Sequence, residues 1–379
     1  MQRKLKIAIM GDFPIGKVYD KYADRTSFYP TWLYNLFEAF SESDEFDIHW
    51  IVVDKIIKQK ETIQIKNQTF HLAPGTGLTV GLYTAYLYNR WQVARIVKKI
   101  KPDLFHGWGT ERFYGLAAKD FKGISLLSVQ GLLRAYCQRA QLSSFLKKQS
   151  FYEKGVLNSV NYITTESPWA TERVLEDAPN ARVFPFDYAV ESSFFQVKRA
   201  LSDNPSCLMA CSNSNVKNVD LAIAAFSRSE LRHVKLYLAG VKKDAYKNLP
   251  KNIIPLGIVN RQDLVKLYSC AWCFVHTSKA DTGPTAVKEA RVAGLPVIVT
   301  DECGAKRFVE SGKSGYIIPL NDENVLVQSV MKVVSSKSVS LKMGIYQHEI
   351  CRNELSINTM LKKISNIYRR ILKMHSNVN

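Results

Sequence analysis

Short runs of aliphatic and β-branched residues alternate with stretches of helical periodicity along the first half of the chain. The runs predict buried strands at 4–13, 46–54, 103–109, 124–129 and 160–165, and the intervals predict helices at 29–41, 81–100 and 138–155. A polar, hairpin-like stretch follows at 60–73. This alternation is typical of βαβ units, which build a parallel sheet. We therefore expect residues 1–195 to form an α/β domain.

The second half repeats the pattern after a polar, proline-marked stretch that begins beyond Phe194 and suits a linker. Further apolar runs predict strands at 207–212, 234–240, 252–257, 273–278, 295–300 and 315–320. Residues 196–355 are thus expected to form a second doubly wound domain, with ligands beyond the carboxyl ends of its strands. The remaining segment, 356–379, predicts an amphipathic helix that could pack back on the N-terminal domain.

Length and composition agree with two soluble α/β domains. A chain of 379 residues exceeds the size at which one hydrophobic core stops growing. With 46% hydrophobic and 23% charged residues, it excludes disorder and coiled coil as the main architecture. Since no apolar run is long enough to span a bilayer and the N-terminal run is too short for a signal peptide, we expect a cytoplasmic protein. The seven cysteines, including Cys270 and Cys273, are expected to be buried thiols and not a disulfide or zinc framework.

Charge is the strongest compositional signal. The 52 basic and 34 acidic residues give a net charge of +18, which implies an anionic partner: nucleic acid, acidic lipid or a phosphorylated substrate. Because no nucleic-acid-binding module accompanies the charge, nucleic acid is not the expected partner. Two predicted basic helices favour the surface of an anionic membrane, the alternative being simply solvated helix faces. The basic residues concerned are Arg134, Arg139, Lys147 and Lys148, near apolar Phe145, Leu146 and Phe151, and Lys362, Lys363, Arg369 and Arg370 in the last helix.

The most informative segment is 277–300, which predicts a strand end, a loop, a helix and the next strand. Gly283-Pro284-Thr285 suits the start of the helix, whose free amide groups would face an anion such as a diphosphate. Asp281 lies in the loop and Glu289 in the helix. The two carboxylates could hold the hydroxyl groups of a sugar and of a ribose on either side of the phosphates.

This segment resembles the family-four retaining glycosyltransferases, in which two acids separated by seven residues precede a glycine turn. Asp281 and Glu289 have that spacing, and 293–297 supplies the turn. Residues 311–322 and 216–226 match the family's glycine-bearing loop and its lysine-bearing helix start. In the first half, 103–118, 125–136 and 164–173 resemble a capsule and lipopolysaccharide branch. The resemblance implies the α/β GT-B fold, with two Rossmann-like, doubly wound domains facing a central cleft.

The resemblance also implies roles for individual residues. Lys217 would neutralise the donor diphosphate, Glu289 would bind the nucleotide ribose, and Asp281 would hold the transferred sugar. The other implied donor-binding residues are Ser212, Asn218, Gly257, Ile258, Gly283, Pro284, Thr285 and Ala286, with Gly257 and Ile258 beside the base. In the first domain His106, Glu111 and Gln130 are expected just after strands, facing the cleft as catalytic residues. From the residues alone, His106 could equally be a core histidine, Glu111 a surface cap and Gln130 a polar loop residue.

Some positions depart from the family's pattern. Ser212 stands where most members have an arginine, so that a diphosphate cation is missing or is supplied by another residue such as Arg261. Asp281 is shorter than the usual glutamate. Gln130 occupies the position that often holds a catalytic histidine and cannot act as a general base, although its amide can hydrogen-bond the donor sugar.

The function implied is retaining transfer of a sugar from a UDP- or GDP-linked donor to a lipid-linked or saccharide acceptor in capsule or lipopolysaccharide synthesis. Such an enzyme would work at the inner face of the cell membrane as a peripheral protein. No metal or cofactor is expected, since the chain has no Asp-x-Asp pair that would hold a divalent ion. The alternatives are a non-catalytic sugar-nucleotide-binding protein of the same fold and a GT-B sugar-nucleotide epimerase.

Overall fold

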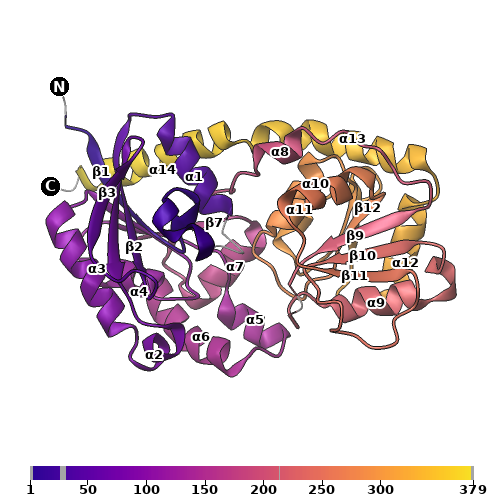
Figure 1. Cartoon of the computed structure of the whole chain (residues 1–379), viewed down its shortest axis with the longest axis horizontal. Helices are drawn as coiled ribbons and strands as arrows, with labels where there is room; N and C mark the ends of the chain where they lie inside the picture. Colours follow the sequence, from indigo (N-terminus) through magenta and orange to yellow (C-terminus); the bar gives the residue numbers. More distant parts are fainter. Residues whose placement is uncertain (1–2, 26–30, 213, 377–379) are drawn as a thin grey trace. The chain divides into compact units, whose positions relative to one another are not determined.

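A computed structural model describes residues 3–25, 31–212 and 214–376, which divide into two compact units (Figure 1). Unit 1 comprises residues up to Cys137, then Leu142–Ala189, and the chain from Ile357 onward. Unit 2 comprises Val190–Ser356 together with Gln138–Gln141. The chain therefore leaves unit 1 just before the expected boundary at 195, and its final helix belongs to the first unit.

Unit 1 is built on a sheet that, in the described residues, has eight strands in the order β3-β4-β2-β1-β5-β6-β7-β8. All neighbouring strands are parallel except the β3/β4 pair, which forms the hairpin expected at 60–73. The strands are β1 (Leu5–Met10), β2 (Phe46–Asp54), β3 (Glu61–Ile65), β4 (Gln68–Pro74), β5 (Leu104–Trp108), β6 (Ser125–Ser128), β7 (Tyr162–Thr165) and β8 (Arg182–Pro185). The five strands expected in this half are confirmed.

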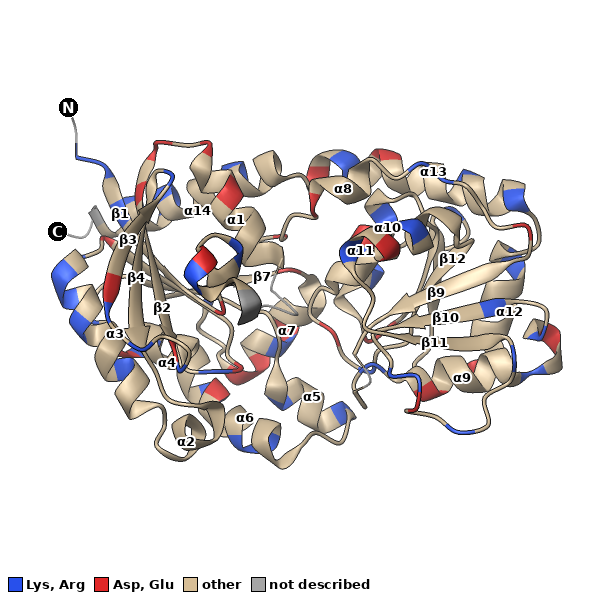
Figure 2. Cartoon of the chain, in the orientation of Figure 1, with Lys and Arg blue, Asp and Glu red and all other residues tan. Residues whose placement is uncertain are grey.

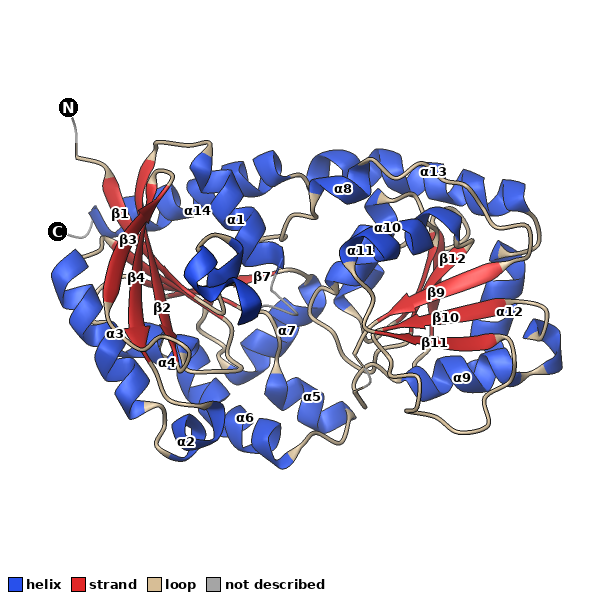
Figure 3. Cartoon of the chain, in the orientation of Figure 1, coloured by secondary structure: helices blue, strands red, loops and turns tan. Residues whose placement is uncertain are grey.

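The helices of unit 1 cover both faces of this sheet (Figure 3). They are α1 (Thr31–Ser41), α2 (Leu78–Tyr83), α3 (Leu87–Ile100), α4 (Tyr114–Asp120), α5 (Leu133–Arg139), α6 (Ser144–Leu157), α7 (Pro168–Asp177) and α14 (Ile357–Ser376). The apolar face of α14 packs into the core of unit 1 beside α1 through Met360, Ile364, Tyr368 and Ile371. Its amphipathic pattern is therefore satisfied by the protein's own core.

Unit 2 has a parallel sheet of six strands, among the described residues, in the order β11-β10-β9-β12-β13-β14. The strands are β9 (Ser206–Ala210), β10 (Lys235–Ala239), β11 (Ile253–Gly257), β12 (Cys273–His276), β13 (Val297–Thr300) and β14 (Gly315–Ile318), as expected. The helices are α8 (Ser192–Phe195), α9 (Val219–Ser227), α10 (Arg261–Cys270), α11 (Thr285–Val292), α12 (Glu323–Val333) and α13 (Lys337–Glu354). This strand order is that of a doubly wound dinucleotide-binding domain.

Alternation along the strands of unit 2 produces two apolar layers. On β9, Cys207 and Met209 belong to the layer under α9 and α12, whereas Leu208 belongs to the layer under α10 and α11. A strand that is apolar on both faces needs helices on both faces to exclude water, and Figure 3 shows them there. The doubly wound α/β architecture predicted for both halves is thus confirmed.

Two predicted helices have different bounds in the structure. The stretch expected at 81–100 is two helices, because Ala85 and Tyr86 adopt positive φ angles of 47° and 54° that break the helix between α2 and α3. The helix expected at 138–155 starts at Ser144, where the Ser143 hydroxyl caps it by accepting a hydrogen bond from the amide of Leu146. Residues 29 and 30 of the helix expected at 29–41 lie outside the described residues.

Within the described ranges, no helix has both the length and the apolarity to cross a membrane. The cysteines are all free thiols, as expected, but only Cys207, Cys273, Cys303 and Cys351 are fully buried. Cys137, Cys211 and Cys270 are half-buried, which corrects the expectation that all seven lie inside.

Candidate functional site

The strand order of unit 2 places two loops side by side at the carboxyl edge of the sheet. Strands β9 and β12 are neighbours, and the connections from them leave toward opposite sides, which makes this the point where the order reverses. Ligands bind at such a point in doubly wound sheets. Lys217 follows β9 and Asp281 follows β12, and their side chains form an ion pair.

Hydrogen bonds between the two loops hold this pair in place. The Thr277 hydroxyl donates to the carbonyl oxygens of Lys217 (3.2 Å) and Asn218 (2.8 Å), and the amide of Lys279 donates to Val216 (2.8 Å). Asn218 adopts a positive φ of 51° at the start of α9, and its side-chain amide donates to Asn321. Two of the predicted donor residues, Lys217 and Asn218, are therefore fixed beside Asp281.

Asp281 is a buried carboxylate between two nitrogen-bearing side chains. Burial would raise its pKa, but the Lys217 ammonium and the hydrogen bond with His276 hold that pKa below its usual value. The His276 Nε2 lies 3.2 Å from the Asp281 Oδ2, and burial lowers the pKa of His276 despite this carboxylate. Asp281 is thus ionised at neutral pH and Lys217 remains charged beside it.

The helix after Asp281 begins as expected from its sequence. Pro284 precedes Thr285, the first residue of α11, and within the described residues it provides no side-chain cap. The amide groups of Thr285 and Ala286 have no acceptor inside the helix, since the first four N–H groups of any α-helix lack one. With Gly283 in the loop before them, these groups can donate to an anionic ligand.

Glu289, one turn into α11, is buried and not a solvated helix carboxylate. Its Oε1 accepts a hydrogen bond from Arg261 (3.0 Å) and its Oε2 accepts one from the Tyr268 hydroxyl (3.3 Å). Arg261 also donates to Glu191 at 2.9 and 3.1 Å. Burial raises the pKa of Glu289, and Arg261 opposes that rise. Arg261, considered from sequence as a diphosphate cation, is paired with two carboxylates instead.

The remaining donor residues are less closely connected to the Lys217 and Asp281 pair. Gly257 ends β11 with a φ of 73° and exchanges backbone hydrogen bonds with the β10 loop, and the following Ile258 is 87% exposed. An exposed apolar side chain on this edge of the sheet suits a contact with a planar base. Ser212 is exposed after β9 and brings no positive charge to the loop.

In unit 1, Glu111 and Gln130 come together after β5 and β6. Both side chains lie against Gly109, which has a φ of 96°: an added Cβ there would be 2.6 Å from the Glu111 Oε2 and 3.2 Å from the Gln130 Oε1. Burial raises the pKa of Glu111 to about 7. A carboxyl that titrates near neutrality at the carboxyl edge of a parallel sheet can exchange protons with a substrate hydroxyl.

The sequence position of His106 suggested a catalytic residue just after a strand, but the structure contradicts this. It lies inside β5, fully buried, with its Nδ1 2.7 Å from the Tyr368 hydroxyl and its Nε2 2.7 Å from the Ser128 hydroxyl. Because both ring nitrogens are used between the sheet and α14, His106 joins the last helix to the core. The simpler prediction, a core histidine, is the correct one.

Sequence reasoning missed a charged group at the equivalent edge of unit 1. Arg112, after β5, pairs with Asp12, after β1, at 3.1 Å, and β1 and β5 are the neighbouring strands where the order of this sheet reverses. Burial raises the pKa of Asp12, which Arg112 opposes. The signal in the sequence is Gly11-Asp12, which directly follows the first strand.

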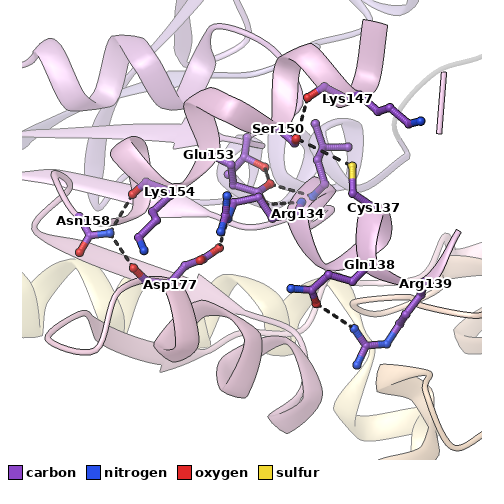
Figure 4. A network of polar contacts seen from close by, with 12 residues as sticks. Arg134, Cys137, Gln138, Arg139, Lys147, Ser150, Glu153, Lys154, Asn158 and Asp177 are labelled. Carbon is purple, nitrogen blue, oxygen red and sulfur yellow. Dashed lines mark hydrogen bonds and ion pairs between the residues drawn. The ribbon is translucent and has the colours of Figure 1, made fainter. Parts of the chain in front are cut away.

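Four of the eight proposed membrane-binding cations form ion pairs with acids. Arg134 donates to Asp177 (2.6 Å), and its own backbone amide donates to Glu153, which accepts hydrogen bonds at the start of α5 (Figure 4). Three others form ion pairs: Arg139 with Glu302, Lys363 with Asp187 and Arg369 with Glu45. Lys147, Lys148, Lys362 and Arg370 are exposed.

Among the described residues, no group of three or more His, Cys, Asp or Glu side chains is arranged to hold a metal ion. Among the predicted site residues of unit 2, those that carry charge are Lys217, Asp281 and Glu289.

Glu111 gives a prediction that concerns stability. Its carboxyl holds a proton more tightly in the folded protein, with a pKa of about 7, than at its ordinary value of 4.5 in the unfolded chain. The free energy of unfolding must therefore fall as pH rises from about 5 to about 7, and Glu111→Gln should remove that part of the fall. Melting temperatures measured across this range check it, with exposed Glu172→Gln as the control; parallel curves for wild type and Glu111→Gln would contradict it.

Comparisons with known proteins agree with this geometry. Residues 191–349 match the family model described as "Glycosyl transferases group 1". These residues cover most of unit 2, including Lys217, Asp281 and Glu289. The resemblance to family-four glycosyltransferases is therefore confirmed over residues 191–349.

The chain is also similar to particular proteins. It is 28% identical over 125 residues to the Escherichia coli UDP-Gal:alpha-D-GlcNAc-diphosphoundecaprenol alpha-1,3-galactosyltransferase, a match that covers 32% of this chain and 30% of that relative. Sucrose-phosphate synthase from Thermosynechococcus elongatus has a TM-score of 0.79 at 14% identity, covering 98% of this chain and 100% of that one. Anabaena HepE in complex with UDP and glucose has a TM-score of 0.69 at 13% identity, covering 97% and 100%. These structures show that the fold is GT-B.

Proposed function

We propose that the protein is a retaining glycosyltransferase. It transfers a sugar from a UDP- or GDP-linked donor to a lipid-linked or saccharide acceptor in the synthesis of a cell-surface polysaccharide, capsule or lipopolysaccharide, at the inner face of an anionic membrane. The observation that carries this proposal is the Lys217 and Asp281 pair beside the open start of α11, at the point where the strand order of unit 2 reverses.

The chemistry follows from these groups. Transfer breaks the bond between the sugar's anomeric carbon and the diphosphate and forms a bond from that carbon to an acceptor oxygen. Negative charge develops on the departing diphosphate, where the Lys217 ammonium and the first amides of α11 stabilise it. The acceptor oxygen attacks the anomeric carbon on the face from which the diphosphate departs, and its proton passes to the departing phosphate. Attack on that face retains the anomeric configuration. Asp281 binds the transferred sugar and Glu289 the ribose hydroxyls.

The diphosphate has to compete with Asp281 for Lys217. Since the two side chains form an ion pair, the donor must draw the ammonium away from Asp281 or share it. The sugar hydroxyls would then take over the oxygens of Asp281, which stays ionised with His276 as its neighbour. We therefore expect the site to bind a complete nucleotide sugar in preference to free phosphate, because only the nucleotide sugar brings hydroxyls to Asp281.

Two relatives support the donor and acceptor classes. HepE holds UDP and glucose in a fold that covers this whole chain. The Escherichia coli relative acts on a diphosphoundecaprenol-linked sugar, which supports a lipid-linked acceptor. The net charge of +18 supports work at an anionic surface.

The test is a transfer assay in which UDP- and GDP-linked sugars are each supplied with an undecaprenyl-diphosphate-linked saccharide. We expect transfer from one donor class, with the anomeric configuration of the donor kept in the product by proton NMR. Tight donor binding without transfer would favour a non-catalytic sugar-nucleotide-binding protein, which Ser212 and Gln130 make the second candidate. Release of a sugar nucleotide whose sugar has a changed configuration, without acceptor, would indicate an epimerase.

A further inference from the structure

Helix α3 buries Val93 and Ile100, but it also exposes large apolar side chains to solvent. Its exposed stripe begins with Leu87, 63% exposed, and Trp91, 50% exposed, and continues at helical spacing to Arg95 and Lys98. Its buried face carries the polar side chains of Asn89 and Gln92. Both have partners inside the protein: Asn89 accepts hydrogen bonds from Thr76, and Gln92 donates to the Tyr88 hydroxyl at 2.9 Å. The outward position of the apolar side chains is therefore fixed by the fold.

Exposed apolar side chains continue from α3 onto its neighbours. In the described part of unit 1, large exposed hydrophobic residues come almost entirely from α2, α3 and α6. On these helices they are Leu78, Val80, Tyr83, Leu87, Tyr88, Trp91 and Phe151, and Leu175 on α7 is the exception. We call these seven residues the apolar face. Its most exposed members are Phe151 at 78% and Tyr83 at 70%.

Direct contacts join the three helices that carry this face. The Tyr152 hydroxyl of α6 donates to the carbonyl oxygen of Leu82 in α2 at 3.0 Å. Lys148 of α6 donates to the Tyr83 hydroxyl of α2 at 2.7 Å. Figure 1 shows α2 between α3 and α6 on the lower side of unit 1. The apolar face is therefore one surface and not three separate sites.

Cations accompany the aromatic rings of this face. The Lys148 ammonium lies 4.3 Å from the centre of the Tyr83 ring, and Arg95 and Lys60 lie 4.8 and 5.3 Å from that of Trp91. Phe151 shares the exposed stripe of α6 with Lys147, Lys148 and Lys154. Figure 2 shows Lys and Arg along the outer sides of α3 and α6.

Acidic residues are missing from the same stretch of sequence. Residues 62–102, which include α2 and α3, contain six Lys or Arg and no Asp or Glu. Exposed Trp, Tyr and Leu side chains accompanied by Lys148, Arg95 and Lys60 match the interface of a bilayer with anionic headgroups, where the rings lie at headgroup depth and the cations meet phosphate. A protein partner's surface would more often place acids and bases on both sides.

We propose that the apolar face of α2, α3 and α6 is the surface that inserts into an anionic lipid bilayer. This inference refines the membrane part of the proposed function, on which it rests. Of the two basic helices predicted from the sequence, it keeps α6 and adds α2 and α3. It leaves out α14, whose apolar residues are buried in the core and whose Lys363 and Arg369 are paired with acids.

The experiment measures binding of the full chain to vesicles of phosphatidylcholine with and without phosphatidylglycerol. Wild type is expected to bind only when phosphatidylglycerol is present. Leu87→Ser/Trp91→Ser should weaken that binding by at least about tenfold, because apolar side chains provide much of the affinity of an interfacial helix. Its melting temperature should stay close to that of wild type, since both side chains are at least half exposed. The control Lys362→Gln/Arg370→Gln removes charge from α14 and should bind like wild type.

A second measurement locates the contact. Brominated lipids should quench the fluorescence of wild type more strongly than that of Trp91→Phe, which keeps the remaining five of the six tryptophans. Equal vesicle binding by wild type and Leu87→Ser/Trp91→Ser would overturn the proposal. So would a loss of self-association in that variant with vesicle binding intact, which would make the face a protein interface.

The vesicle-binding and quenching results test the apolar face whether or not the protein transfers a sugar. If wild type binds vesicles through this face but transfers no sugar to any acceptor, the proposed function fails and the membrane face stands. If it transfers sugar to a water-soluble acceptor and does not bind anionic vesicles, the membrane face fails and the transferase stands. We expect Leu87→Ser/Trp91→Ser to keep transfer to the soluble acceptor and to lose transfer to an acceptor held in vesicles.

Discussion

Lys217→Met should lower kcat/KM for the nucleotide-sugar donor by about two to three orders of magnitude, the usual effect of removing one group that stabilises developing charge. The variant loses the ammonium that pairs with Asp281 in the loop before α11, where the proposed function places the departing diphosphate. Steady-state kinetics with the donor identified in the transfer assay provide the measurement. A kcat/KM within a few-fold of the wild-type value would contradict the proposed position of the diphosphate.

The same substitution should also destabilise the fold, and this effect has to be separated from catalysis. Removing Lys217 leaves Asp281 charged and buried with only His276 beside it, which should cost about 3 kcal/mol at neutral pH. Because the pKa of Asp281 is lowered in the folded protein, its contribution is present at neutral pH and is lost as pH falls. The difference in melting temperature between wild type and Lys217→Met should therefore narrow in acid.

The matched control is the double variant Lys217→Met/Asp281→Asn. Replacing the carboxylate with a neutral amide removes the unpaired charge, so that much of the lost stability should return while kcat/KM stays low. If the double variant instead recovers activity together with stability, Lys217 serves only to hold Asp281. Asp281→Asn alone should mainly lower kcat, because the sugar it binds is the group transferred.

Glu289→Gln should raise the KM for the donor by about ten- to a hundredfold, with a smaller change in kcat. A hydrogen bond to a charged group contributes about 1.5–3 kcal/mol, and the ribose hydroxyls would lose such a bond. The Tyr268 hydroxyl and Arg261 hold the carboxylate in position, so the variant also tests whether that position serves a ligand. Donor binding measured by calorimetry and by KM should change in parallel.

The control for Glu289 is Glu191→Gln, which removes the other carboxylate bound to Arg261. Both variants disturb the arginine, but only Glu289→Gln removes the group assigned to the ribose. Equal losses of melting temperature with unchanged donor affinity in both would show that Glu289 only stabilises Arg261 in the interior. A loss of donor affinity restricted to Glu289→Gln supports its assignment.

The sequence predicted an element correctly where the local pattern of its residues matches the burial that the fold gives it. The apolar runs became β9–β14 because strands buried on both faces need continuous hydrophobic residues. Asp281 and Glu289 could be singled out because their spacing around Gly283-Pro284 belongs to a helix start, and α11 begins there. These features depend on neighbours within a few residues, which a sequence displays directly.

Other features depend on residues far apart in the chain. His106 looked like a site residue, yet its partner Tyr368 lies 262 positions away, and only that hydrogen bond identifies it as part of the core. Arg261 looked like a diphosphate cation, but it pairs with Glu191 and Glu289. The final helix looked like a membrane helix because its apolar partners in unit 1 are distant in sequence.

By itself, the sequence determined the two doubly wound sheets, the start of α11 at Gly283-Pro284-Thr285, and the excess of positive charge. Hydrophobic periodicity and turn residues act over a few positions and fix these locally. Only the tertiary structure decided which charges are free and which apolar side chains face water. Lys217 meets Asp281, Glu289 meets Arg261, and Trp91 stays outside while Asn89 lies inside, because burial and pairing depend on which elements pack together and not on the residues next to them in the chain.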